Sequence, residues 1–135
     1  MKAASLSAAA ARFIGAPFRL YGRDPASGLD CVGLVAAALS ATGRMPLVPH
    51  AYALRVSDIG NCLEFASANG FREASGPVAP DDLILVRPGP AQFHLLIAEH
   101  RRSFIHAHAG LRRVVRMPGP LGWPVDRHWY LSSKD

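Results

Sequence analysis

The residues best suited to chemistry in this chain are a cysteine and a group of histidines. Cys31 follows Asp30 at the start of an apolar, helix-forming run. Asp is a good N-cap, so Cys31 is expected in the first turn of a helix, where free backbone N–H groups and the positive end of the helix dipole meet. That position favours a thiolate. The sequence therefore predicts a lowered thiol pKa and a nucleophilic cysteine.

A buried core role is the alternative for Cys31, because free cysteines are among the most buried residues. Gly33, two residues further on, favours a special site instead. A glycine inside a helix costs about 1 kcal/mol relative to alanine and usually has a packing or access reason.

A cysteine nucleophile needs a base, and the base needs a group that orients it. The chain has six histidines. Two apolar segments, 93–99 and 103–108, are predicted to pair as antiparallel strands around His100. That register places His94 directly opposite His106, with Cβ atoms about 5 Å apart on one face. One imidazole can then orient the other, and a slip of one residue would separate them.

Other assignments of these side chains remain open. His108 shares the strand face of His106 and is the alternative third residue, and His94 could be a structural histidine. A zinc site is a further alternative, but no close Cys-x-x-Cys or His-x-x-x-His pair is present. Its ligands would be Cys31, His94, His106 and His108. The remaining histidines are interpreted as non-catalytic, namely His50, His100 and His128.

The periodicity places helices before strands, which indicates an α+β domain with the sheet packed on the cysteine helix. Helices are predicted over 3–14, from Cys31 to near Gly43, and from a cap at Ser57 or Asp58 to Gly70. The third helix has an apolar face of Ile59, Cys62, Leu63 and Ala66. Strands are predicted over 83–86, 93–99, 103–108, 112–117 and 128–131.

Length and composition indicate one domain, 1–135. The chain has 135 residues, is 50% hydrophobic and carries a net charge of +5. A positive net charge favours an anionic partner. The arginine pairs lack interleaved aromatic residues, so nucleic acid is not the expected partner. No run approaches the roughly 18 apolar residues of a membrane span. Cys31 and Cys62 are expected to be reduced, with Cys62 structural.

Three blocks of the sequence resemble the NlpC/P60 cysteine peptidases, particularly their phage and gene-transfer-agent branch. The first block joins residues 15–25 (GAPFRLYGRDP) to 28–35 (GLDCVGLV). The second is 82–85 (DLIL) followed by 94–97 (HLLI), and the third is 105–107 (IHA). The blocks occur in the family's order and extend over most of the chain. The resemblance implies a papain-like fold.

The resemblance also implies roles for individual residues. Cys31 would be the nucleophile, His94 the base and His106 the third catalytic residue. No metal or other cofactor is implied. Because the backbone N–H of Cys31 points from the helix start, it is the expected oxyanion donor.

Departures from the family pattern affect the predicted substrate and oxyanion side of the site, which comprises Tyr21, Asp30 and Val32. Val32 stands where most relatives have Ser, and Phe18 where they have Tyr. Tyr21 is the candidate for supplying the missing hydroxyl. Asp81 stands where the family usually has Gly before the conserved Asp.

The resulting hypothesis is a cysteine peptidase that cleaves an amide bond of a peptidoglycan stem peptide, next to γ-D-glutamyl as the resemblance implies. A binding or structural module of a phage-like tail is one alternative, and an amidase or acyltransferase on the same scaffold is another. The alanine-rich start of the chain lacks the apolar centre of a signal peptide. We therefore expect cytoplasmic synthesis and delivery to the wall by a tail particle or by lysis.

Overall fold

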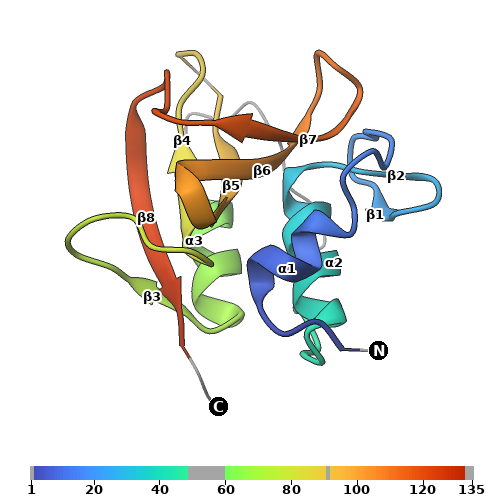
Figure 1. Cartoon of the computed structure of the whole chain (residues 1–135), viewed down its shortest axis with the longest axis horizontal. Helices are drawn as coiled ribbons and strands as arrows, with labels where there is room; N and C mark the ends of the chain where they lie inside the picture. Colours follow the sequence, from blue (N-terminus) through green and yellow to red (C-terminus); the bar gives the residue numbers. More distant parts are fainter. Residues whose placement is uncertain (1, 49–59, 91, 133–135) are drawn as a thin grey trace.

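The computed structural model describes residues 2–48, 60–90 and 92–132, whose arrangement Figure 1 shows. Most helices precede most strands, as predicted. The helical elements are α1 (Leu6–Ala11), α2 (Cys31–Ala41), α3 (Gly60–Ala68) and the 3-10 turn η1 (His100–Arg102). The strands are β1 (Arg23–Asp24), β2 (Gly28–Leu29), β3 (Phe71–Glu73), β4 (Leu83–Val86), β5 (His94–Glu99), β6 (Ser103–His108), β7 (Arg113–Pro118) and β8 (Val125–Leu131).

Strands β3 to β8 form one antiparallel sheet in the order β3-β8-β4-β5-β6-β7. Side chains alternate between its faces, and both faces are covered. One face packs with α1 and α2 through Leu83, Leu85, Leu95, Ile97 and Ile105. The other carries Ile84, Val86, Leu96, Ala98 and Phe104 beneath Leu121 and Trp123. The predicted α+β fold, with the cysteine helix against the sheet, is confirmed.

The helices follow the sequence with one clear exception. Helix α2 begins at Cys31, as predicted from its cap. The segment predicted as a helix over 3–14 is helical only from Leu6, where Ser5 is the N-cap, to Ala11. It ends early because the next residues turn toward the sheet, where Gly15 N–H donates to the Val114 carbonyl. Among the described residues, no helix is long and apolar enough to cross a bilayer.

The strands at the sheet's centre agree with prediction, and the short ones were missed. The β1–β2 hairpin and β3 are absent from the predicted strands. Two- and three-residue strands are too short for an alternating pattern to show. The last strand begins at Val125 rather than at 128. The proposed caps Ser57 and Asp58, together with Ile59, lie outside the described residues.

Three glycines let the β1–β2 hairpin approach the first turn of α2. A Cβ on Gly33 would lie 2.0 Å from the carbonyl oxygen of Gly22, and a Cβ on Gly22 would lie 2.2 Å from that of Gly28. Gly28 itself has a φ of +138°. Gly33 therefore has the packing reason that its place inside a helix indicated.

Replacing Gly33 by alanine should destabilise the fold, although alanine is the better helix former. The new Cβ would force backbone apart, and overpacking of this kind costs about 1–3 kcal/mol. That exceeds the roughly 1 kcal/mol gained in helix propensity, so urea denaturation should show a net loss of unfolding free energy. Gly122→Ala is the matched control, since nothing lies within 4 Å of its Cβ position. A Gly33→Ala protein as stable as wild type would contradict the close approach.

Candidate active site

The site begins with the carboxylate of Asp30, which is fully buried. Its Oδ1 accepts the backbone N–H of Gly33 at 2.8 Å, which confirms the predicted N-cap. Its Oδ2 accepts the backbone N–H of Tyr21 at 2.7 Å. Tyr21 has a φ of +61°, a conformation that favours glycine. One carboxylate thus fixes both the start of α2 and a strained turn beside it.

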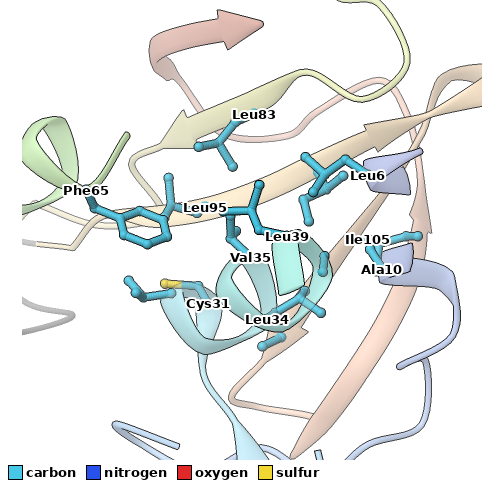
Figure 2. Close-up of a cluster of buried hydrophobic side chains, with 14 of the residues drawn as sticks. Leu6, Ala10, Cys31, Leu34, Val35, Leu39, Phe65, Leu83, Leu95 and Ile105 are labelled. Atoms are coloured by element: carbon cyan, nitrogen blue, oxygen red, sulfur yellow. The ribbon is translucent and has the colours of Figure 1, made fainter. Parts of the chain in front are cut away.

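Cys31 opens α2 as predicted, but its thiol is buried. The residue is 2% exposed and lies in the apolar cluster with Phe65 and Leu95 (Figure 2). Burial raises the thiol pKa far above its ordinary value and the Asp30 carboxylate raises it further, while backbone hydrogen bonds from Leu95 and Val32 lower it by less. The predicted lowering of this pKa is therefore wrong, because lost hydration outweighs the effect of the helix N-terminus.

The thiol nevertheless lies beside the strand that carries the first histidine. The backbone hydrogen bond from Leu95 places Cys31 at the start of β5, where His94 is the preceding residue. Within the described residues, no hydrogen bond joins Cys31 to His94 or to His106. The thiol and the imidazoles thus lie near the same end of β5, on opposite faces of that strand, without being hydrogen-bonded.

The two predicted histidines are bonded to each other. His94 Nε2 and His106 Nδ1 are 2.7 Å apart, and their rings are inclined by 75°. His106 is 1% exposed. Because Nε2 of His94 is engaged with His106, its Nδ1 is the nitrogen left for other chemistry. The prediction that one imidazole can orient the other is confirmed.

The strand register behind this pair differs from the prediction by two residues. The ladder pairs Ile97 with Ile105, where the prediction pairs it with Ser103. Continued along β5, this register sets His94 opposite His108 and makes His106 its diagonal neighbour. A shift of two residues keeps every side chain on its predicted face, and long side chains reach diagonal partners. The pair therefore forms despite the wrong register.

Burial keeps both imidazoles neutral near neutral pH. It lowers the pKa of His94 to about 3, with further lowering by His106 and His108. It lowers the pKa of His106 to about 4, again with a contribution from His108. A neutral imidazole has a lone pair with which to accept a proton, but the lowered pKa also makes each ring a weaker base than an ordinary histidine.

The histidines line a cavity of about 290 Å³ at the end of the sheet. Its walls are largely apolar and include Phe18 from the loop before α2. The complete lining is Phe18, Pro88, Gln92, Phe93, His94, His106, Ala107, His108, Ala109, Gly110 and Trp123. Trp123 stands against both catalytic candidates, with ring centroids 6.2 Å from His94 and 5.9 Å from His106. Sequence reasoning missed it, because no periodic pattern marks its loop.

The other predicted site residues are placed differently. Tyr21 is half exposed and Val32 is buried, and neither lines the histidine cavity. Among the described residues, no three His, Cys, Asp or Glu side chains are arranged to hold a metal ion. His128 Nε2 lies 2.6 Å from Asp82 Oδ2, away from the cavity lining. His50 lies outside the described residues.

Comparisons with known proteins identify the fold. No family model and no curated protein matches the chain. The NlpC/p60 domain of the peptidoglycan hydrolase SagA is 27% identical with a TM-score of 0.63, over 95% of this chain and 97% of that one. The peptidoglycan hydrolase RipB from Mycobacterium tuberculosis is 20% identical with a TM-score of 0.63, over 96% of this chain and 64% of that one. The P60 domain of an antigen from M. avium subspecies paratuberculosis is 19% identical with a TM-score of 0.60, over 96% of this chain and 93% of that one. The chain has the fold of NlpC/P60 domains, as its motifs predict.

Alkylation with iodoacetamide should separate the two free cysteines. Cys62 is partly exposed and burial raises its pKa to about 11, whereas Cys31 is 2% exposed with a still higher pKa. We expect Cys62 to react faster at neutral pH, and its rate to rise about tenfold per pH unit below its pKa, because the thiolate is the nucleophile. Mass spectrometry of Cys31→Ser and Cys62→Ser proteins measures each thiol alone. Faster labelling of Cys31 would contradict its burial.

Proposed function

We propose that the chain is a cysteine peptidase that hydrolyses an amide bond in a peptidoglycan stem peptide. The observation that carries the proposal is the hydrogen bond between His94 and His106 at the strand end beside Cys31. It leaves His94 Nδ1 free to serve as a base. The fold neighbours SagA and RipB, both described as peptidoglycan hydrolases, support the substrate class.

In the proposed reaction, Cys31 Sγ attacks the carbonyl carbon of the scissile amide while His94 takes the thiol proton. His94 then gives that proton to the leaving amine, which departs as the C–N bond breaks and leaves a thioester. Water hydrolyses the thioester, with His94 accepting a proton from the water and returning it to Cys31. His106 orients His94 throughout. The backbone N–H of Cys31 at the start of α2 stabilises the developing oxyanion.

The buried thiol adds a conformational requirement to this reaction. Attack requires the Cys31 side chain to turn out of the cluster with Phe65 and toward His94. A neutral thiol loses less hydration in the core than a thiolate would, which suits the buried resting position. Proton transfer to His94 is then part of the attack rather than a step that precedes it.

The substrate assignment has further support from charge. A net charge of +5 attracts anionic partners, and wall polymers are acidic. The resemblance to NlpC/P60 enzymes suggests cleavage next to γ-D-glutamyl. In this proposal Tyr21, Asp30 and Val32 form the side of the site nearest the helix start, and Val32 in place of a serine alters recognition of the peptide's end. Delivery by a phage-like tail particle is the proposed route to the wall.

The burial of Cys31 favours one second candidate, a binding module of a phage-like tail that keeps the fold without the chemistry. In that role Cys31 is a small core residue, and its raised pKa is a consequence of packing. The hydrogen-bonded histidine pair argues for the peptidase, since binding alone does not require it.

Digestion of purified peptidoglycan tests the proposal directly. Wild type should release fragments whose masses identify the cleaved amide, and Cys31→Ser should release none because a hydroxyl is a far weaker nucleophile. Cys62→Ser is the matched control and should retain activity. Cleavage by Cys31→Ser at the wild-type rate would exclude Cys31 as the nucleophile, and no cleavage by wild type would favour the binding module. Transfer of the acyl group to an added amine in place of water would indicate an acyltransferase.

Substitutions at the histidines should rank by role. Proton transfer is typically worth 10²–10⁴-fold, so His94→Ala should lose most activity. His106→Asn or His106→Gln keeps a hydrogen-bonding group and should retain more activity than His106→Ala. His100→Ala, in the exposed turn η1, is the control and should match wild type. If His108→Ala were as damaging as His94→Ala while His106→Ala was silent, His108 would be the third residue.

A further inference from the structure

The loop between β7 and β8 places an indole ring against both members of the histidine pair. The Trp123 ring is nearly perpendicular to each imidazole, at 89° to His94 and 82° to His106. Trp123 and Leu121 of the same loop pack on the apolar face that includes Leu96 and Phe104. The ring is thus held in place by packing that does not involve the imidazoles.

A second observation concerns the outer nitrogen of His106. Its Nε2 is buried and, within the described residues, has no hydrogen-bond partner. Its Nδ1 is taken by His94. A buried imidazole nitrogen without a partner costs free energy whether it carries a proton or a lone pair, so its surroundings decide which form is favoured.

We propose that Trp123 is a positioning residue that selects the tautomer of His106 in which Nε2 carries the proton. The inference rests on the proposed peptidase function for its catalytic meaning, while the tautomer itself is a property of the resting protein. An aromatic face is electron-rich, so it attracts an N–H group and repels a lone pair. The Trp123 ring stands against His106 with ring centroids 5.9 Å apart, and the His108 ring lies 5.3 Å from His106 at a tilt of 43°.

The tautomer of His106 determines that of His94, because the pair shares one hydrogen bond. With the proton on Nε2 of His106, Nδ1 of His106 accepts, and His94 Nε2 must donate. His94 Nδ1 then carries a lone pair and can accept the thiol proton of Cys31. In the opposite tautomer His94 Nδ1 carries the proton and cannot act as a base.

The other titratable groups near the pair lie on β6, β7 and α2. Among the residues that line the cavity, the titratable ones are His94, His106 and His108. His108 Nδ1 accepts the backbone N–H of Leu111. Beyond them lie Arg113, directly opposite His108 on β7, and the Cys31 thiol, near Leu95 on the other face of β5.

Nitrogen NMR of the imidazoles tests the tautomer in the full chain without substrate. Wild type should show a protonated Nε2 and an unprotonated Nδ1 on His106, and likewise a protonated Nε2 and an unprotonated Nδ1 on His94. In Trp123→Leu the population ratio of the two tautomers should move by about two- to fivefold, the size of a weak N–H···π interaction. Trp123→Phe keeps an aromatic face and should stay near wild type. Leu121→Ala is the matched loop control and should not change the ratio.

Kinetics on peptidoglycan fragments supply the second readout. Trp123→Leu should lower kcat more than it changes KM. It should also move the acid limb of kcat/KM to higher pH, because water admitted to the pair raises the low pKa of His94 and the base is protonated sooner. Unchanged tautomers in Trp123→Leu, or the same change in Leu121→Ala, would overturn the inference. If wild type shows the stated tautomers but cleaves nothing, the proposed function fails while the role of Trp123 in the pair stands.

Discussion

The fully buried carboxylate of Asp30 holds the helix start and the preceding loop together, and the rest of the site depends on it. A buried charge is tolerated only when it is hydrogen-bonded, and here backbone N–H groups of Gly33 and Tyr21 meet its two oxygens. The loop then continues to the sheet, where Phe18 N–H donates to the Arg112 carbonyl beside the histidine strand. One side chain therefore links the helix that begins at Cys31 to the edge of the cavity.

The sheet supplies the other constraint, because its two faces serve different purposes at one strand end. Leu95 faces the helices and supplies the backbone hydrogen bond to Cys31, while the adjacent His94 joins His106 and Trp123. Alternation along β5 thus sets thiol and base on either side of the same backbone. Burial raises the pKa of the Cys31 thiol and lowers that of His94, so both groups are neutral near neutral pH.

The sequence could predict features that depend on local residue pattern or on which face of a strand a side chain occupies. The cap at Asp30 and the strand Ser103–His108 follow from residue type and alternation, and the structure confirms both. The predicted register of β5 against β6 is wrong by two residues. The pairing of His94 with His106 is nevertheless correct, because a two-residue shift leaves each side chain on the same face of the sheet.

Effects that arise from contacts between residues distant in the sequence could not be predicted from it. The thiol pKa was predicted from the helix end alone, but Phe65 and Leu95 bury the sulfur, and neither is near Cys31 in sequence. Trp123 gave no signal because its position depends on how a proline-containing loop crosses the sheet. The early end of α1 likewise reflects the pairing of Gly15 with Val114.

The position of Cys31 at the helix N-terminus suggests that the helix stabilises a resting thiolate. Because the thiol is buried and neutral, the helix N-terminus has a different role in the proposed reaction. If Cys31 rested as a thiolate, the free N–H groups of α2 would stabilise the ground state as much as the reaction. Because lost hydration and the Asp30 carboxylate oppose ionisation, those groups are left to act on charge that develops during attack. Interactions stronger in the transition state than in the ground state are the ones that accelerate a reaction. In the proposed reaction, the buried Asp30 carboxylate thus shifts the electrostatic stabilisation from the resting thiol toward the oxyanion, with His94 taking the proton as the bond forms.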